Sequence, residues 1–131
     1  MKHTILIIED NEQNLYLATF LLEQGGFKVV AARSGPEGIA LAGRSQPDLI
    51  LLDIQLPQLD GYAVARELRR NPDLKDVPIV AVTSYAMAGD RERTLEAGCS
   101  GYIEKPINPD TFRSEVDKYL EAGPAGEGSQ T

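Results

Sequence analysis

Short apolar runs recur along this chain at nearly regular intervals, and segments with a helical pattern lie between them. The runs occupy residues 4–8, 27–32, 49–53, 77–83 and 101–104. The run Thr4-Ile5-Leu6-Ile7-Ile8 lacks polar alternation, which is typical of a strand buried on both faces. Strands that alternate with helices across short loops predict an α/β fold, in which a parallel sheet carries helices on both faces.

The segments between the runs carry signals for helix starts and ends. An apolar stripe from Leu17 to Leu22 precedes Gly25-Gly26, which predicts a helix that ends there. Ser34 and Glu37 have the spacing of a capping box and open a helix to about Arg44. Further helices are expected from Gly61 to about Arg70, through Arg91 to Ala97, and from the N-cap Asn108, with Pro109 at the first helical position, to about Ala122.

Length and charge limit the classes of protein to consider. The chain has 131 residues, enough for one domain, and its 13 basic and 20 acidic residues give a net charge of −7. This balance argues against direct binding of nucleic acid, which needs a stripe of Lys and Arg. The apolar runs are too short to span a membrane, and the single cysteine, Cys99, fits a reducing compartment. We therefore expect a cytoplasmic protein with one folded domain, residues 1–122, and a disordered tail rich in glycine, residues 123–131.

Polar residues follow or end most of the expected strands. Glu9-Asp10 follow the first strand, Asp53 ends the third, Thr83 ends the fourth, and Lys105 follows the fifth. In open α/β sheets the site lies at the carboxyl ends of the strands. These carboxylates, the hydroxyl and the ammonium are therefore expected to meet at one edge of the sheet.

The expected cluster has a definite chemistry. Carboxylates at short range raise each other's pKa unless a counter-charge is present, and an acidic pocket rich in oxygen suits Mg²⁺, which takes one or two carboxylates and phosphate oxygens. Asp53 is also a plausible nucleophile that would form an aspartyl-phosphate. Lys105 could then neutralise phosphoryl oxygens, and the Thr83 hydroxyl could donate to one of them.

In their order and spacing these residues resemble the response-regulator receiver family, of which the CheY-like proteins are members. The resemblance covers about residues 4–122, and the chain is most similar to single-domain regulators of the DivK type or to receivers of hybrid histidine kinases. It implies a flavodoxin-like (βα)5 fold with a five-stranded parallel sheet in the order 2-1-3-4-5. The matching loop sequences are Leu56-Pro57, Asp60-Gly61, Ala97-Gly98-Cys99 and Gly101-Tyr102.

The resemblance also implies roles for individual residues. Asp53 matches the phosphoacceptor and Asp10 the direct Mg²⁺ ligand. Glu9 matches a second acidic position that often acts through water, and Gln55 would supply its backbone carbonyl to the metal. The remaining matches are Lys105 as the phosphoryl-binding cation, Thr83 as the hydroxyl that moves toward the phosphoryl group, and Tyr102 as the aromatic switch that rotates inward with it.

Receivers usually have a cis peptide bond before the proline that follows the lysine, so Lys105-Pro106 is a candidate. Gln55 and Tyr85 occupy positions that tune the lifetime of the phosphoryl bond in this family. A docking surface for a histidine-bearing partner is expected near the acidic residues, and Met87 is a candidate for an exposed patch. The docking candidates are Asn14, Leu15, Tyr16 and Ile107.

The leading hypothesis is a phosphoacceptor in a two-component system or phosphorelay. A histidine kinase or histidine phosphotransfer protein would hand its phosphoryl group to Asp53, and the change at Thr83 and Tyr102 would alter binding of a downstream protein at the face of the fourth helix, fifth strand and fifth helix. Such a protein acts only on its own side chain and is not an enzyme with an external substrate. The alternative is a module with the same fold that binds proteins without phosphorylation.

Two enzyme or ligand classes fit the sequence less well. A haloacid-dehalogenase phosphohydrolase needs an aspartate two residues after its nucleophile, where this chain has Gln55, and more chain for a cap. A nucleotide or flavin binder needs a phosphate loop rich in glycine or in serine and threonine after the first strand. This chain has Glu9-Asp10-Asn11-Glu12 there.

Overall fold

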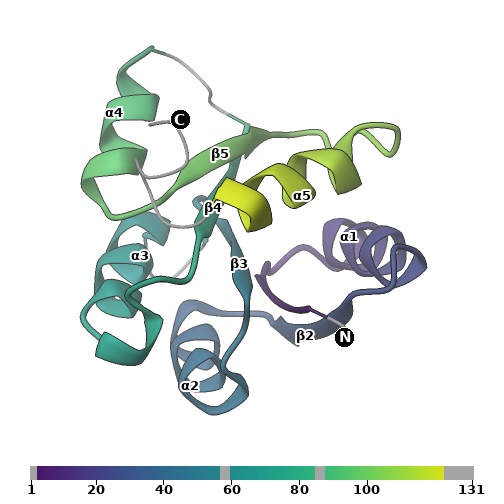
Figure 1. Ribbon diagram of the computed structural model, residues 1–131. Coiled ribbons are helices and arrows are strands. Elements are labelled where there is room, and N and C mark those ends of the chain that lie inside the picture. The colour runs from purple at the N-terminus through teal and green to yellow at the C-terminus, as the bar shows by residue number, and fades with distance from the viewer. Residues whose placement is uncertain (1–2, 57–59, 85–87, 123–131) are drawn as a thin grey trace.

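The computed structural model describes residues 3–56, 60–84 and 88–122. Its strands form one parallel sheet in the order β2-β1-β3-β4-β5, with helices on both faces (Figure 1). The expected doubly wound fold and strand order are confirmed. The elements, in chain order, are β1 (Thr4–Ile8), α1 (Glu12–Gln24), β2 (Lys28–Ala32), α2 (Gly35–Ser45), β3 (Leu49–Asp53), α3 (Gly61–Arg69), the 3₁₀ turn η1 (Pro72–Leu74), β4 (Ile79–Thr83), α4 (Ala88–Glu96), β5 (Gly101–Glu104) and α5 (Phe112–Ala122).

The core lies in two layers, one on each side of the sheet. Side chains such as Leu6 and Ile50 point toward α2 and α3, whereas Ile5 and Leu51 point toward α1 and α5. β3 and β4 are buried along their whole length because they are interior strands covered on both faces. Figure 1 shows this division, with α1 and α5 on one side of the sheet and α2, α3 and α4 on the other.

The last helix begins later than the sequence indicates. Asn108 does cap the local chain, since its side chain accepts from the Asp110 N–H at 2.9 Å. Its carbonyl, however, accepts from both Thr111 and Phe112, so residues 109–111 form a tight turn and α5 starts at Phe112. The start at Pro109 was therefore wrong by three residues. β2 and β4 also begin later than expected, at Lys28 and Ile79.

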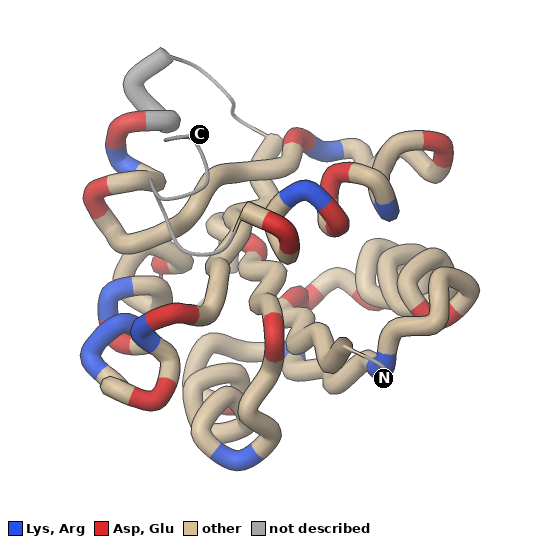
Figure 2. Tube along the Cα trace, in the orientation of Figure 1, with Lys and Arg blue, Asp and Glu red and all other residues tan. Residues whose placement is uncertain are grey.

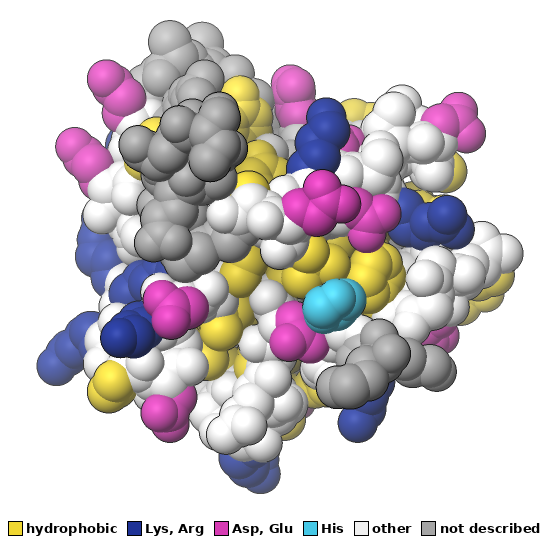
Figure 3. Space-filling model, in the orientation of Figure 1, with side chains coloured by type: hydrophobic (Ala, Val, Ile, Leu, Met, Phe, Trp, Pro, Cys, Tyr) yellow, Lys and Arg dark blue, Asp and Glu magenta, His cyan; other side chains and the backbone are white. Residues whose placement is uncertain are grey.

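The surface carries both signs of charge. Lys and Arg lie among acidic residues along the trace, with basic positions gathered toward the end of α3 (Figure 2). On the face shown in Figure 3, apolar side chains are visible between α1 and α5, close to the single histidine. His3 is exposed, and its Nδ1 lies 3.7 Å from a carboxylate oxygen of Asp48. Among the described residues, no helix combines the length and apolar content that crossing a bilayer requires.

Candidate functional site

The carboxyl ends of β1 and β3 bring three carboxylates together. Glu9 and Asp10 follow β1, Asp53 is the last residue of β3, and one ligand oxygen from each lies within 4.8 Å of the others. Glu9 and Asp53 are buried, whereas Asp10 is exposed. β1 and β3 are neighbours with Ile8 opposite Leu52, so the parallel register itself places these acids side by side.

Lys105 supplies the positive charge at this cluster. Its Nζ lies 3.2 Å from Asp53 Oδ1 and 3.6 Å from Glu9 Oε1, and its side chain is only 14% exposed. Lys105 directly follows β5, and its backbone N–H donates to the Thr83 carbonyl at 2.8 Å. The Lys105-Pro106 peptide bond is cis, as the resemblance implies.

The cluster carries more negative charge than the chain neutralises. Burial, followed by a hydrogen bond and the charge of Asp53, raises the pKa of Glu9 to about 7, although the Asn11 N–H and Lys105 act in the opposite direction. One ammonium offsets one of three carboxylates, which leaves two excess charges when all are ionised. A divalent cation would balance them, and oxygen ligands of this kind suit Mg²⁺.

Backbone groups fix the buried carboxylates in place. Asp53 Oδ1 accepts from the Gln55 N–H at 2.9 Å, and Glu9 Oε2 accepts from the Asn11 N–H at 3.1 Å. The loop after β3 returns closely at Gly61, whose N–H donates to the Ile54 carbonyl at 3.1 Å. A side chain at Gly61 would lie 2.8 Å from the carbonyl oxygens of Asp53 and Ile54, so the close return requires glycine.

Thr83 and Tyr102 lie on the two strands beyond β3. Thr83 is buried at the end of β4, whose Val82 lies opposite Asp53. Tyr102 is half-buried on β5, opposite Ala81, and it packs against the core layer that faces α2 and α3. The structure therefore brings Glu9, Asp10, Asp53 and Lys105 close together. Thr83 lies on β4, next to β3, and Tyr102 lies on β5, one strand farther along the sheet.

The expected docking residues differ in how far they are exposed. Leu15 is only 6% exposed and belongs to the core, so it cannot serve as a docking contact. Tyr16 is 74% exposed and stacks with Phe20, which is 47% exposed, at 6.4 Å between ring centroids. Phe20 was not predicted as part of this surface, although it lies one helical turn beyond Tyr16 and that spacing could have indicated the pair. Tyr85 and Met87 lie outside the described residues.

Comparison with protein families gives a direct result. The model of the response regulator receiver domain matches residues 5–117. The chain belongs to the response-regulator receiver family. Its acidic cluster and the lysine after β5 are the candidate functional site.

Curated relatives place this receiver near one type of regulator. It is 42% identical over 120 residues to the polar-differentiation response regulator DivK of Brucella ovis, covering 92% of this chain and 98% of that protein. The DivK proteins of Brucella suis and Brucella abortus match to the same extent. The receiver is thus similar to DivK over nearly its whole length.

Solved structures agree on the fold and include one with a metal. The receiver domain of the sensor histidine kinase PA1611 from Pseudomonas aeruginosa PAO1 is 34% identical with a TM-score of 0.84, covers 92% of this chain and 99% of its own, and holds a magnesium ion in its active-site cleft. The chemotaxis protein CheY4 of Vibrio cholerae, 23% identical, has a TM-score of 0.87 over 90% of this chain and 98% of its own, which shows the shared fold. The oxygen ligands of Glu9, Asp10 and Asp53 fit such an ion.

Proposed function

We propose that this receiver accepts a phosphoryl group on Asp53 from a histidine kinase or a histidine phosphotransfer protein, as a step in a two-component pathway or phosphorelay. One observation carries the proposal. Asp53 is a buried carboxylate at the end of a central strand, held between Lys105 and the Glu9–Asp10 pair. A site for phosphoryl transfer needs a nucleophile, a cation and oxygen ligands for a metal in one place, and all of these are present.

In the proposed transfer a carboxylate oxygen of Asp53 attacks the phosphorus of a phosphohistidine. The new P–O bond forms as the P–N bond breaks, and the bonding electrons leave with the imidazole of the donor. Lys105 stabilises the negative charge on the phosphoryl oxygens, because its Nζ already lies 3.2 Å from the acceptor carboxylate. Glu9, Asp10, Asp53 and the backbone carbonyl of Gln55 would hold Mg²⁺, which supplies further neutralisation of phosphoryl charge when bound.

We propose that Thr83 and Tyr102 report the phosphoryl group to a downstream protein. The Thr83 hydroxyl would donate to a phosphoryl oxygen, and the half-buried Tyr102 would turn inward in response. The bond from the Lys105 N–H to the Thr83 carbonyl joins the ends of β4 and β5, which supports a common response. The output is then a shift between two conformations that the partner distinguishes.

The same proposal covers the organisation and location of the chain. Residues 1–122 would form the receiver, residues 123–131 lie outside the described residues, and the site of action would be the cytoplasm. Asp53 would turn over no external substrate. The competing function is a receiver fold that binds partners without phosphorylation, and the assembled cluster around Asp53 favours phosphorylation over it.

The deciding experiment records the intact mass of the protein after incubation with acetyl phosphate. Wild type, Asp53→Ala and the exposed control Asp117→Asn are compared with and without Mg²⁺. We expect one added phosphoryl group in wild type and Asp117→Asn, only with Mg²⁺, and none in Asp53→Ala. A folded wild-type protein that gains no phosphoryl group from acetyl phosphate or from a panel of phosphorylated histidine kinases would instead favour the phosphorylation-independent module.

A further inference from the structure

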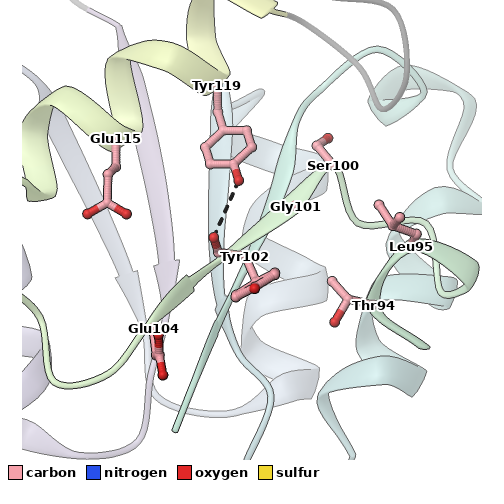
Figure 4. Close-up of a pocket in the computed structure, with 8 residues that line it drawn as sticks. All are labelled: Thr94, Leu95, Ser100, Gly101, Tyr102, Glu104, Glu115 and Tyr119. Atoms are coloured by element: carbon pink, nitrogen blue, oxygen red, sulfur yellow. Dashed lines mark hydrogen bonds between the residues drawn. The ribbon is translucent and has the colours of Figure 1, made fainter. Parts of the chain in front are cut away.

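A hollow of about 390 Å³ lies along β5, between α4 and α5, and it is separate from the acidic cluster at Asp53. Figure 4 shows Tyr102 and Tyr119 beside β5, with glutamates toward one end and Leu95 at the other. The side chains that matter for its chemistry are Thr94, Leu95, Tyr102, Glu104, Glu115 and Tyr119.

The charge of the hollow has one sign. Glu104 is exposed at the end of β5, and Glu115 is half-buried on α5. Among the residues that the structure places around the hollow, none is Lys or Arg. Glu115 Oε1 accepts from the Thr111 hydroxyl at 3.0 Å, but a carboxylate has about four acceptor positions and can take further donors.

Tyr119 forms a fixed aromatic wall. Its hydroxyl donates to the Tyr102 carbonyl at 3.3 Å, which holds the ring against β5 (Figure 4). The ring fits there because residue 101 is glycine: a Cβ at Gly101 would lie 2.6–2.7 Å from Tyr119 ring carbons and would also collide with its hydroxyl. Tyr102 supplies a second ring. Aromatic rings beside carboxylates form an environment that favours a planar cation.

We propose that this hollow receives an arginine side chain of the downstream partner protein. The guanidinium would pair with Glu104 and Glu115 and contact the tyrosine rings, and a neighbouring apolar residue of the partner would cover Leu95, which is 44% exposed. The net charge of −7 favours approach of a basic partner. The inference rests on the proposed function for the identity of the partner as the downstream target, and it adds the chemistry by which that target is recognised.

Because Tyr102 lines the hollow, a change in its position would change the shape of the arginine site. The same residue is the proposed switch. The site would thus be present in the unphosphorylated protein and be altered by phosphorylation, which gives one ligand two affinities.

The test uses the full chain, labelled with ¹⁵N and not phosphorylated, with Mg²⁺ present to occupy the acidic cluster. L-argininamide is titrated while amide shifts are recorded by NMR, and L-citrullinamide, which has the same α-amine but a neutral urea in place of the guanidinium, serves as the control probe. The variants are Glu104→Gln, Glu115→Gln and their combination. Glu121→Gln, exposed near the end of α5 and outside the hollow, is the matched control.

We expect saturable shifts with argininamide around Gly101–Glu104 and on α5, and much smaller shifts with citrullinamide. Each glutamine variant should weaken binding by roughly two- to five-fold, as for exposed ion pairs, and the double variant should abolish it. Equal responses to both probes, shifts confined to the neighbourhood of Asp53, or equal affinity in the double variant and Glu121→Gln would overturn the inference. Thermal unfolding of each variant verifies that it is folded. Since no phosphodonor is present, failure here leaves the mass experiment on Asp53 unaffected.

Discussion

Among the described residues, a half-buried arginine and a buried acidic cluster hold their charge in opposite ways. At the end of α3, the Arg69 guanidinium donates to the carbonyls of Gly98 at 2.8 Å, Leu74 at 2.8 Å and Val77 at 2.7 Å. At the carboxyl ends of β1 and β3, three carboxylates share a single lysine. Arg69 therefore has three of its five N–H donors paired by backbone carbonyls, while the acidic cluster keeps negative charge that Lys105 does not offset.

This difference distinguishes a structural site from the candidate ligand site. Arg69 ties together α3, the turn η1 and the turn before β5, and Cys99 packs fully buried beside this region. Burial lowers the pKa of Arg69, yet its hydrogen bonds run to neutral carbonyls that no ligand need replace. The acidic cluster is the reverse case, because one lysine offsets only one of its three carboxylates when all are ionised. Buried charge alone does not indicate function; uncompensated buried charge does.

The largest expected effect tests how closed the Arg69 region is. Burial raises the pKa of the Cys99 thiol from 9.0 to about 12, although Arg69 acts in the opposite direction. Since a raised pKa means less thiolate at any pH below it, the reactive form at pH 8 falls about a thousand-fold. Iodoacetamide at pH 8 should leave the native protein unmodified and label it rapidly in concentrated urea, as read from the intact mass. Cys99 is the single cysteine, so any label reports on it alone. Native labelling as fast as in urea would mean that this region is open.

The next largest effect is expected when the charge of Arg69 is removed. Arg69→Met removes the arginine N–H donors from the carbonyls of Leu74, Val77 and Gly98, of which the Leu74 carbonyl still accepts from the Val77 N–H. The free energy of unfolding should therefore fall by about 3 kcal/mol. The matched control is Arg66→Met, one turn earlier on α3 and exposed, which should change it by less than about 0.5 kcal/mol. Urea unfolding followed by circular dichroism measures both. Equal losses in the two variants would show that Arg69 contributes no more than a surface residue.

A smaller loss is expected where the loop after β3 approaches the acidic cluster. In Gly61→Ala the new methyl would meet the carbonyl oxygens of Asp53 and Ile54, each at 2.8 Å, and would cost about 2 kcal/mol of unfolding free energy. Gly43→Ala is the matched control, since its nearest neighbour is 3.9 Å away, in the interior of α2. There alanine should stabilise by about 0.5–1 kcal/mol through helix propensity. Because the two variants should change the unfolding free energy in opposite directions, thermal unfolding distinguishes them clearly. A stabilised Gly61→Ala would contradict the close approach of Gly61 to the carbonyls of Asp53 and Ile54.

The sequence predicted the acidic side of this comparison better than the other. Glu9, Asp53 and Lys105 end or follow strands, and the register of a parallel sheet carries such positions to one edge, so pattern and topology were enough. The start of α5 was misplaced because Asn108 and Pro109 are a valid helix start by local rules, while the backbone instead closes a tight turn up to Phe112.

Arg69 and the hollow along β5 were not predicted, for a physical reason. An arginine in the last turn of a helix has the pattern of a solvated charge, and the carbonyls that it reaches come from loops near residues 74, 77 and 98. Tyr119 and Gly101 likewise meet only when α5 packs on β5. Contacts between a side chain and distant backbone leave no periodic signal in a single sequence, whereas strand ends do.

The smallest effect is expected when one of the three neighbouring carboxylates is removed. The change in the free energy of unfolding should then be opposite in sign to that of Arg69→Met. Asp53→Asn keeps an oxygen to accept from the Gln55 N–H and relieves repulsion with Glu9, so without metal the variant should be more stable than wild type by about 1 kcal/mol. Added Mg²⁺ should reverse the order, because a ligand at a hundred times its dissociation constant stabilises the wild type by about 2.7 kcal/mol while the variant binds it poorly. Thermal unfolding with and without Mg²⁺, beside the exposed control Asp117→Asn, measures both steps. A variant that is less stable than wild type under both conditions would mean that Asp53 is balanced by its neighbours as Arg69 is, and the contrast between the two buried sites would then be lost.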